Sequence, residues 1–143
     1  IDTATEIDTI DRKIVRILQQ DATLSQRELA DRVGLSQNAC WRRLQRLRAE
    51  GILREAQTKV DLEAFGLDLT VFVMIRTRHH SAEWATKFRS KVEQLPEVTG
   101  FYRIGGEWDY MIKVVTCGMK GYDAFYKRLT ADLDLATVTG FFS

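Results

Sequence analysis

The apolar residues near the start of the chain recur at helical spacing. One stripe is formed by Ile7, Ile10, Ile14, Ile17 and Leu18, a periodicity typical of an amphipathic helix. Asp8 is placed to cap the start of this helix, because its side chain can accept a hydrogen bond from a free backbone amide. The chain is therefore expected to open with a helix that buries one face.

Two further helices are predicted, with a glycine between them. Ser25 and Glu28 have the spacing of a capping box, in which each side chain bonds the other residue's backbone amide. Gly34 ends this helix at a position where a positive φ is needed. Ser36 caps the next helix, whose buried stripe comprises Cys40, Leu44 and Leu47. Two helices joined by a short turn that contains glycine make a helix-turn-helix.

The pattern after this helix divides the chain. Residues 52–60 alternate loosely between apolar and polar side chains and predict a small hairpin or wing. We therefore expect a winged helix-turn-helix domain over residues 1–60, a linker over residues 61–68 and a second domain over residues 69–143. The sequence stops inside the last predicted strand, so we expect the C-terminal end of this domain to be incomplete.

The second domain is predicted to alternate between strands and helices. Strands are expected over residues 69–78, 98–104, 109–116 and 137–142, and a helix is expected over residues 81–95. A second helix is indicated by the spacing of Tyr122, Phe125, Leu129 and Leu133. The order βαββαβ defines a ferredoxin-like domain, so the expected fold class is α+β.

The first strand of this domain is apolar on both faces. Phe72 and Met74 alternate with Val71, Val73 and Ile75. Both helices of a ferredoxin-like domain cover one face of the sheet, so the other face needs a different cover. The simplest cover is the sheet of a second copy, which favours a homodimer. The N-terminal domain and residues beyond Ser143 are the alternatives.

The composition excludes several classes of protein and of site. The 143 residues carry a net charge of +1, and the longest apolar run is too short to cross a membrane. Cys40 and Cys117 have no partners at the spacing of metal ligands, so we expect neither a disulfide framework nor a metal site. We expect no cofactor, and a cytoplasmic protein. The first residue is Ile1 instead of Met, which indicates a trimmed start, and we expect no signal peptide.

Positive charge is concentrated in the third predicted helix. Between Ser36 and Arg54 lie five arginines and one acidic residue, Glu50, which gives a local charge of +4. Such a concentration is expected of a helix that lies against DNA phosphates. Helical spacing places Asn38, Arg42 and Gln45 opposite the buried stripe. A solvated basic face is the alternative interpretation.

The residue types on this helix suit double-stranded DNA. Arginine matches guanine, whereas asparagine and glutamine match adenine. Asn38 and Arg42 rank first as base contacts, because the N-terminal end of a recognition helix usually enters the groove. The expected DNA-binding residues are Ser36, Gln37, Asn38, Trp41, Arg42, Arg43, Gln45 and Arg46. Arg43, Arg46 and Arg48 are expected to hold phosphates.

These features resemble the Lrp/AsnC family of bacterial and archaeal transcriptional regulators. Its opening helix and helix-turn-helix are matched by Ile7, Asp8, Asp11, Leu18, residues 28–30 and 32–36, Cys40, Arg43, Leu44, Leu47, Gly51 and Ile52, and its Gly-acidic-aromatic-Asp motif is matched by residues 106–110. The resemblance implies a DNA-binding regulator that pairs through its sheets and often assembles further into octamers. It also implies that a small effector, commonly an amino acid, binds between subunits near the glycine loop.

The resemblance implies that the loop around Gly106 binds the effector. Its expected effector-binding residues are Gly105, Gly106, Glu107, Trp108, Asp109 and Tyr110. Amides at the two glycines can approach a carboxylate, and Glu107 or Asp109 can accept bonds from an ammonium group. Trp108 and Tyr110 can wall the site. The alternative is a plain hairpin turn in which Asp109 bonds its own backbone.

Two other functions stay open on the sequence. Siroheme decarboxylases resemble this architecture, and the adjacent His79 and His80 at a strand end suggest such an enzyme. Neighbours in a strand point to opposite faces, however, so these histidines do not converge. No nucleophile–base pair stands out, and no catalytic residue is expected. An architectural DNA-binding protein without an effector is the third possibility.

Overall fold

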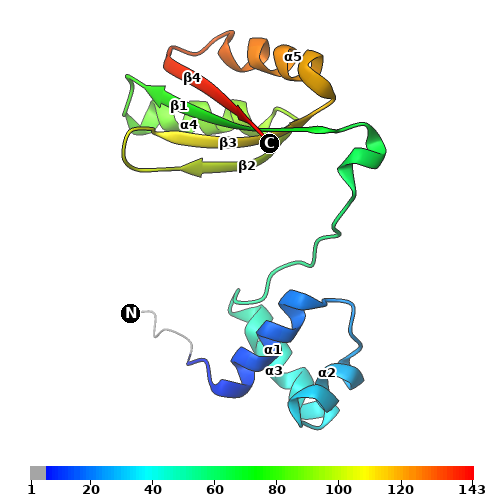
Figure 1. Ribbon diagram of the computed structural model, residues 1–143. Helices are drawn as coiled ribbons and strands as arrows, with labels where there is room; N and C mark the ends of the chain where they lie inside the picture. The colour runs from blue at the N-terminus through cyan, green and yellow to red at the C-terminus, as the bar shows by residue number, and fades with distance from the viewer. Residues whose placement is uncertain (1–5) are drawn as a thin grey trace. The chain divides into compact units, whose positions relative to one another are not determined.

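The computed structural model describes residues 6–143 and divides into two compact units between Lys59 and Val60 (Figure 1). The first unit consists of three helices: α1 (Thr9–Gln20), α2 (Gln26–Val33) and α3 (Gln37–Ala49). Their apolar faces meet in one core, formed by Ile14, Leu29, Ala30, Val33, Cys40, Leu44 and Leu47. The predicted stripe of the third helix is therefore buried, whereas in the stripe of the first helix Ile14 is buried and Ile10, Ile17 and Leu18 pack partly buried against the core.

Capping residues set where these helices begin and end. Asp8, Ser25 and Ser36 each accept a hydrogen bond from the backbone amide three residues further on. Gly34 ends α2 in the left-handed conformation, with a φ of 71°. The predicted box at Ser25 forms only in half, because Glu28 is exposed and its carboxylate stays in solvent.

The segment after α3 departs from the prediction. Residues 54–61 form no helix or strand, and all are exposed. Among residues 6–143 the hairpin predicted within residues 52–60 does not form, because none of the strands in this part of the chain pairs with the segment. The predicted linker contains a short 3-10 helix, η1 (Leu62–Phe65), which belongs to the second unit.

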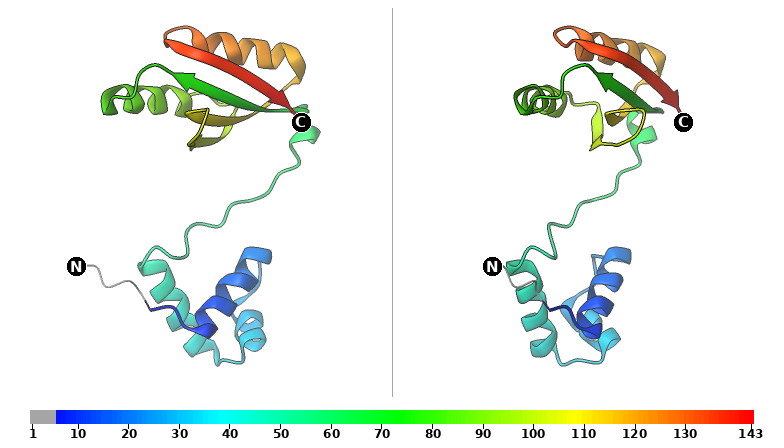
Figure 2. Two further views of the ribbon diagram at one scale, coloured as in Figure 1. Left: turned by 60° about the vertical axis from the view of Figure 1, so that its left-hand side comes forward. Right: turned by 90° about the vertical axis from the view of Figure 1, so that its left-hand side faces the viewer.

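The second unit is a four-stranded antiparallel sheet with two helices. Its elements are β1 (Leu69–Thr77), α4 (Ala82–Glu93), β2 (Val98–Arg103), β3 (Tyr110–Thr116), α5 (Gly118–Thr130) and β4 (Leu135–Phe142). The strand order is β2-β3-β1-β4. Both helices pack on the same face of the sheet (Figure 2), where Phe88 of α4 and Phe125 of α5 share a core with β1 and β3. This confirms the predicted βαββαβ domain.

Alternation along β1 separates the two faces of this sheet. Val71, Val73 and Ile75 are fully buried under the helices, whereas Phe72 and Met74 on the other face are half-buried. Strand pairing brings Phe141 beside Phe72, Met111 beside Met74, and Tyr102 beside Met111. Tyr102 and Phe141 are each more than half exposed. The helix-free face is therefore apolar and open, as the pattern along the first strand predicts.

The described residues contain neither a membrane-spanning helix nor a cluster of metal ligands. No helix among them is long and apolar enough to cross a membrane. No group of three or more His, Cys, Asp or Glu side chains in this part of the chain gathers as metal ligands would. The thiols of Cys40, which is buried, and Cys117, which is exposed, are both free.

Gly140 allows β4 to approach α5 closely. A methyl group at this position would lie 2.6 Å from the Tyr122 hydroxyl oxygen and 3.1 Å from a Val71 methyl carbon. Because both neighbours are packed in the core, Gly140→Ala should lower the free energy of unfolding by about 1–3 kcal/mol. Urea denaturation followed by circular dichroism measures this change.

Gly105→Ala is the matched control for this substitution. A methyl group on Gly105 would meet no atom within 4 Å, so the expected change is within about 0.5 kcal/mol. Equal unfolding free energies for the two variants would contradict the close approach at Gly140.

Candidate DNA interface and effector loop

The side of α3 away from the core presents polar side chains to solvent. Asn38, Arg42 and Gln45 are exposed, as is Gln37 at the start of the helix. The indole of Trp41 is 47% exposed. Asparagine, glutamine and arginine carry the donors and acceptors that pair with base edges. Their exposure agrees with the helical spacing, and their contact with bases stays a prediction.

Arg43 and Arg46 lie on the flank of α3 that meets α1. The Nη1 atom of Arg43 lies 2.5 Å from Oδ2 of Asp8 and 3.0 Å from Oδ1 of Asp11. Arg46 forms an ion pair with Oδ2 of Asp11 and donates a hydrogen bond to the carbonyl oxygen of Glu6 at 3.2 Å. Asp11 is fully buried, so its carboxylate needs both guanidinium groups.

These contacts change the charge that α3 offers to a ligand. The hydrogen bond from Arg43 lowers the pKa of Asp8 to about 2, and a bond from the Asp11 amide adds to the effect. Counting the carboxylates of Asp8 and Asp11 with residues 36–54 reduces the local charge from +4 to +2. The sequence-based interpretation treated Arg43 and Arg46 as free cations, whereas the fold gives each an internal partner.

The sequence does carry a signal for this cluster. Asp11 stands on the apolar stripe of α1, three residues before Ile14. An acidic residue on a buried stripe requires a hydrogen-bonding or ionic partner. An arginine on a flank of a packed helix is the natural candidate. The phosphate contacts expected of Arg43 and Arg46 stay a prediction.

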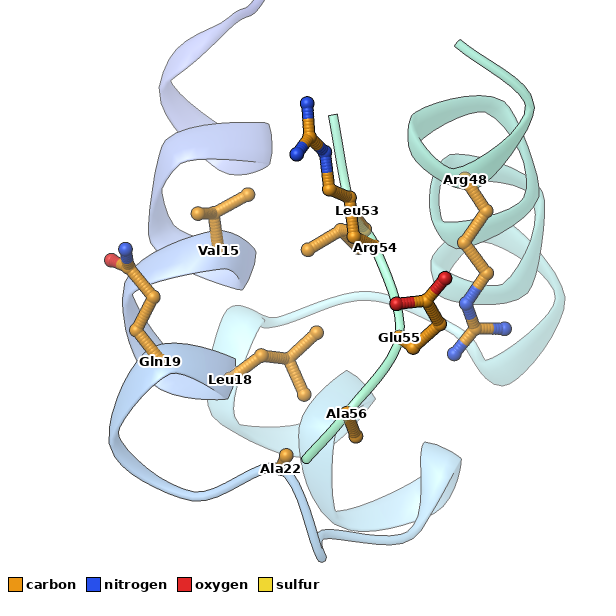
Figure 3. A pocket seen from close by; sticks show the side chains of 9 residues that line it. All are labelled: Val15, Leu18, Gln19, Ala22, Arg48, Leu53, Arg54, Glu55 and Ala56. Carbon is orange, nitrogen blue, oxygen red and sulfur yellow. The ribbon is translucent and has the colours of Figure 1, made fainter. Parts of the chain in front are cut away.

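Arg48 and Arg54 differ from these two arginines. Within residues 6–143 neither takes part in an ion pair. Both border a hollow of about 550 Å³ in the first unit, beside an apolar wall that includes Val15, Leu18 and Leu53 (Figure 3). Their guanidinium groups are therefore available to an external anion. Arg54 lies beyond the end of α3 and adds to the positive charge counted from the sequence.

The loop between β2 and β3 is tied to β1 through Asp109. The amide of Asp109 donates to the Ile75 carbonyl oxygen at 2.9 Å, and its carbonyl oxygen accepts from the Ile104 amide at 3.0 Å. The Asp109 carboxylate accepts a hydrogen bond from the Thr77 amide at 2.8 Å. This resembles the predicted alternative, except that Asp109 bonds the backbone of a neighbouring strand instead of its own. One carboxylate oxygen thus already has a structural use.

Glu107 and Trp108 fold back onto Arg76 of β1, through an ion pair and a cation–π contact. Gly105 and Gly106 are exposed, and Gly106 has a φ of +87°. In the part of the chain that the structure describes, the amides of residues 105–108 donate no hydrogen bond. The loop therefore presents consecutive free donors on a glycine turn.

The ring of Tyr110 is buried in the core of the second unit and borders a polar hollow next to the loop, so its role as a wall of the effector site stays a prediction. Alternation along β3 turns its ring to the helix-covered face, where it is buried 4.9 Å from the Phe88 ring and 5.5 Å from the Phe101 ring. A polar hollow of about 170 Å³ lies beside Tyr110 and Asp109, and it is also lined by His80, Ser81, Ala82, Ala85 and Arg103.

The two adjacent histidines do not converge on one site. His80 lines the polar hollow beside Asp109. The Nε2 atom of His79 lies 2.9 Å from Oδ2 of Asp134, and its ring stacks on Trp84. The two rings thus face different surroundings, as expected for neighbours at the end of a strand.

Comparison with known proteins covers both units. Residues 7–54 match the family model described as winged helix-turn-helix DNA-binding, and residues 70–143 match that of the Lrp/AsnC ligand binding domain. Over 138 residues the chain is 48% identical to the DNA-binding transcriptional activator DecR of Escherichia coli, covering 96% of this chain and 91% of DecR. It is 41% identical to the glutamate uptake regulatory protein of Zymomonas mobilis, covering 96% and 84%.

Solved structures of similar proteins share the fold. An AsnC family transcriptional regulator from Agrobacterium tumefaciens is 44% identical, with a TM-score of 0.90 over 95% of this chain and 89% of that one. A transcriptional regulator from Neisseria meningitidis, solved as a complex with L-methionine, is 28% identical with a TM-score of 0.90, covering 96% and 90%.

Asp11→Ala should destabilise the first unit. The substitution removes the acceptor of two charge-assisted hydrogen bonds from Arg43 and Arg46, so we expect the free energy of unfolding to fall by about 2–3 kcal/mol. Asp31→Ala serves as the control, because Asp31 is exposed on α2 and should change stability by less than about 0.5 kcal/mol. Similar small changes in urea denaturation would refute the role given to Asp11.

Proposed function

The chain belongs to the Lrp/AsnC family of DNA-binding transcriptional regulators, and we propose that two copies paired through their sheets bind DNA under the control of an amino acid. The main support for this proposal is that each unit has its own candidate binding surface. The first unit offers the exposed side of α3, and the second offers a loop of free backbone amides.

On the DNA side, we assign different tasks to different arginines. Arg42 is exposed on the same side of α3 as Asn38, and both suit contacts with bases. Arg48 and Arg54 have no ion pair among the described residues, which suits contacts with phosphates. Arg43 and Arg46 hold α3 against α1 through Asp11. Any contact that these two make with DNA comes in addition to that role.

Pairing of two copies is supported by the helix-free face of the sheet. Phe72, Met74, Met111, Tyr102 and Phe141 bring apolar surface together on this face. An apolar patch of this kind marks an interface between proteins more often than a free surface. A homodimer buries the patch symmetrically and brings two copies of α3 to one DNA duplex. Assembly into an octamer stays a prediction from the resemblance.

The chemistry of the loop supports an amino acid as the effector. Four consecutive amides, at residues 105–108, are free on a turn where Gly106 has a positive φ. Consecutive amides on such a turn form a concave site for an anion such as a carboxylate. The free side of the Asp109 carboxylate, beside the polar hollow, is suited to an ammonium group. A similar protein binds L-methionine, and another is named for glutamate uptake.

The different tasks of these arginines predict different effects on DNA binding for two substitutions. Arg42→Ala should cost about 1–3 kcal/mol on a selected DNA site and relax the base preference. Arg48→Ala should weaken selected and random DNA about equally and reduce the salt slope of log affinity by about one. Arg48 is preferred to Arg46 for this test, because removing Arg46 also frees the buried Asp11.

The measurement is fluorescence anisotropy at several salt concentrations, on DNA selected from a random pool and on a scrambled control. Equal losses on both DNAs for both variants would refute the division of tasks. An affinity that does not change with salt would refute the phosphate contacts altogether.

The loop assignment predicts that Gly106→Val impairs effector binding. A β-branched side chain is strained at a φ of +87°, so the amides turn away and the affinity for an amino acid should fall about ten-fold or more. Gly118→Val is the matched control, because Gly118 has a φ of +63° and a methyl group there would meet no atom within 4 Å. It should bind the effector as wild type does.

Calorimetric titration with a panel of amino acids measures these affinities. Equal binding by Gly106→Val and wild type would refute the role of the loop. If no amino acid alters DNA affinity or assembly, the sensing role is wrong for this protein.

A further inference from the structure

Arg76 makes three contacts with the loop that precedes β3, from a position 31 residues earlier in the chain. Its Nε atom donates to the Glu107 carbonyl oxygen at 2.9 Å. Its Nη2 atom lies 3.2 Å from Oε1 of Glu107. Its guanidinium carbon lies 4.9 Å from the centre of the Trp108 ring. One planar group thus contacts a backbone carbonyl, a carboxylate and an aromatic ring.

The geometry requires arginine. A guanidinium group can donate in its plane to two acceptors while its face lies over an aromatic ring, whereas an ammonium group cannot do both in a fixed orientation. The ion pair alone would order little, because Arg76 and Glu107 are 39% and 76% exposed at their side chains. The three contacts together restrict both the position and the rotation of the loop.

The backbone at Arg76 is held in place by strand pairing. Arg76 pairs with Thr137 of β4, directly before the irregularity in the pairing of β1 and β4. The next residue, Thr77, donates its amide to the Asp109 carboxylate. Adjacent residues of β1 therefore hold the loop at two points: Arg76 holds its middle, and Thr77 holds its last residue.

We propose that Arg76 is a positioning residue for the effector loop. Its side chain holds the amides of residues 105–108 in the arrangement that binds a carboxylate. This inference rests on the proposed effector site. It changes the part assigned to Glu107, whose carboxylate is engaged by Arg76 and serves the loop instead of the ligand's ammonium group. It also places the control of the loop on the helix-free face of the sheet, to which Arg76 belongs by its alternation with Phe72 and Met74.

The conformation of the loop can be tested without an effector. In a background in which Trp41 and Trp84 are replaced by phenylalanine, Trp108 is the remaining tryptophan, and acrylamide quenching of its fluorescence measures how far the ring is covered. Arg76→Gln and Arg76→Lys should both raise the quenching constant, by about two-fold if the ring leaves the guanidinium face. Arg78→Gln is the control, because Arg78 pairs with Asp134 and makes no contact with the loop.

The effect on binding is then measured by calorimetric titration with the amino acid that wild type binds. If the loop keeps its binding arrangement in about one molecule in ten, the apparent affinity falls about ten-fold. Arg76→Gln and Arg76→Lys should both show this loss, and Arg78→Gln should not. Full rescue by Arg76→Lys would overturn the proposal, since charge alone would then suffice.

A double-mutant cycle separates positioning from direct contact. If Glu107 acts through Arg76, the losses of Arg76→Gln and Glu107→Gln should be non-additive. Additive losses would mean that Glu107 binds the ligand itself, which would overturn the part given to it here. Unchanged quenching in Arg76→Gln would overturn the positioning role even if wild type binds no amino acid. Failure of the proposed function and failure of this inference are therefore distinguishable.

Discussion

A buried carboxylate sets the position of the recognition helix. Asp11 is fully buried between α1 and α3, and an ionised group in such a place is stable only when cations reach it. Arg43 and Arg46 are one helical turn apart, so both can reach Asp11 only over a narrow range of rotations of α3. The same rotation turns Asn38 and Arg42 to solvent. The exposed side of α3, which we propose faces DNA, is therefore oriented by a contact on its flank.

Features that depend on local chemistry could be predicted from the sequence. Ser25 and Ser36 cap helices because their hydroxyl groups sit three residues before free amides, and Gly34 ends a helix because its backbone tolerates a positive φ. The two faces of β1 follow from alternation alone, which is why the open apolar face was foreseen. Helical spacing likewise identified the exposed side of α3, since only the position of Cys40 and its stripe was needed.

Features that depend on distant partners could not be predicted in this way. Arg43 meets Asp8 across 35 residues, and Arg76 meets Glu107 across 31, so neither pair has a local signature. The prediction of a hairpin within residues 52–60 was wrong for a related reason. Alternation indicates an extended segment but does not show whether a partner strand lies beside it. The burial of the Tyr110 ring also depends on the pairing of β3 with distant strands, and the motif that contains Tyr110 does not indicate it.

The internal use of charged side chains narrows what the effector loop can recognise. Glu107 is bonded to Arg76, and one oxygen of Asp109 is bonded to the Thr77 amide. The groups left free in the loop are backbone amides and the other carboxylate oxygen of Asp109. They suit the carboxylate and the ammonium group, which are the same whatever side chain the amino acid carries. Under the proposed function, affinity for the common part of an amino acid therefore comes from the loop. Discrimination between amino acids must then come from side chains outside it, such as Arg103 and His80 beside the polar hollow or residues of a second subunit.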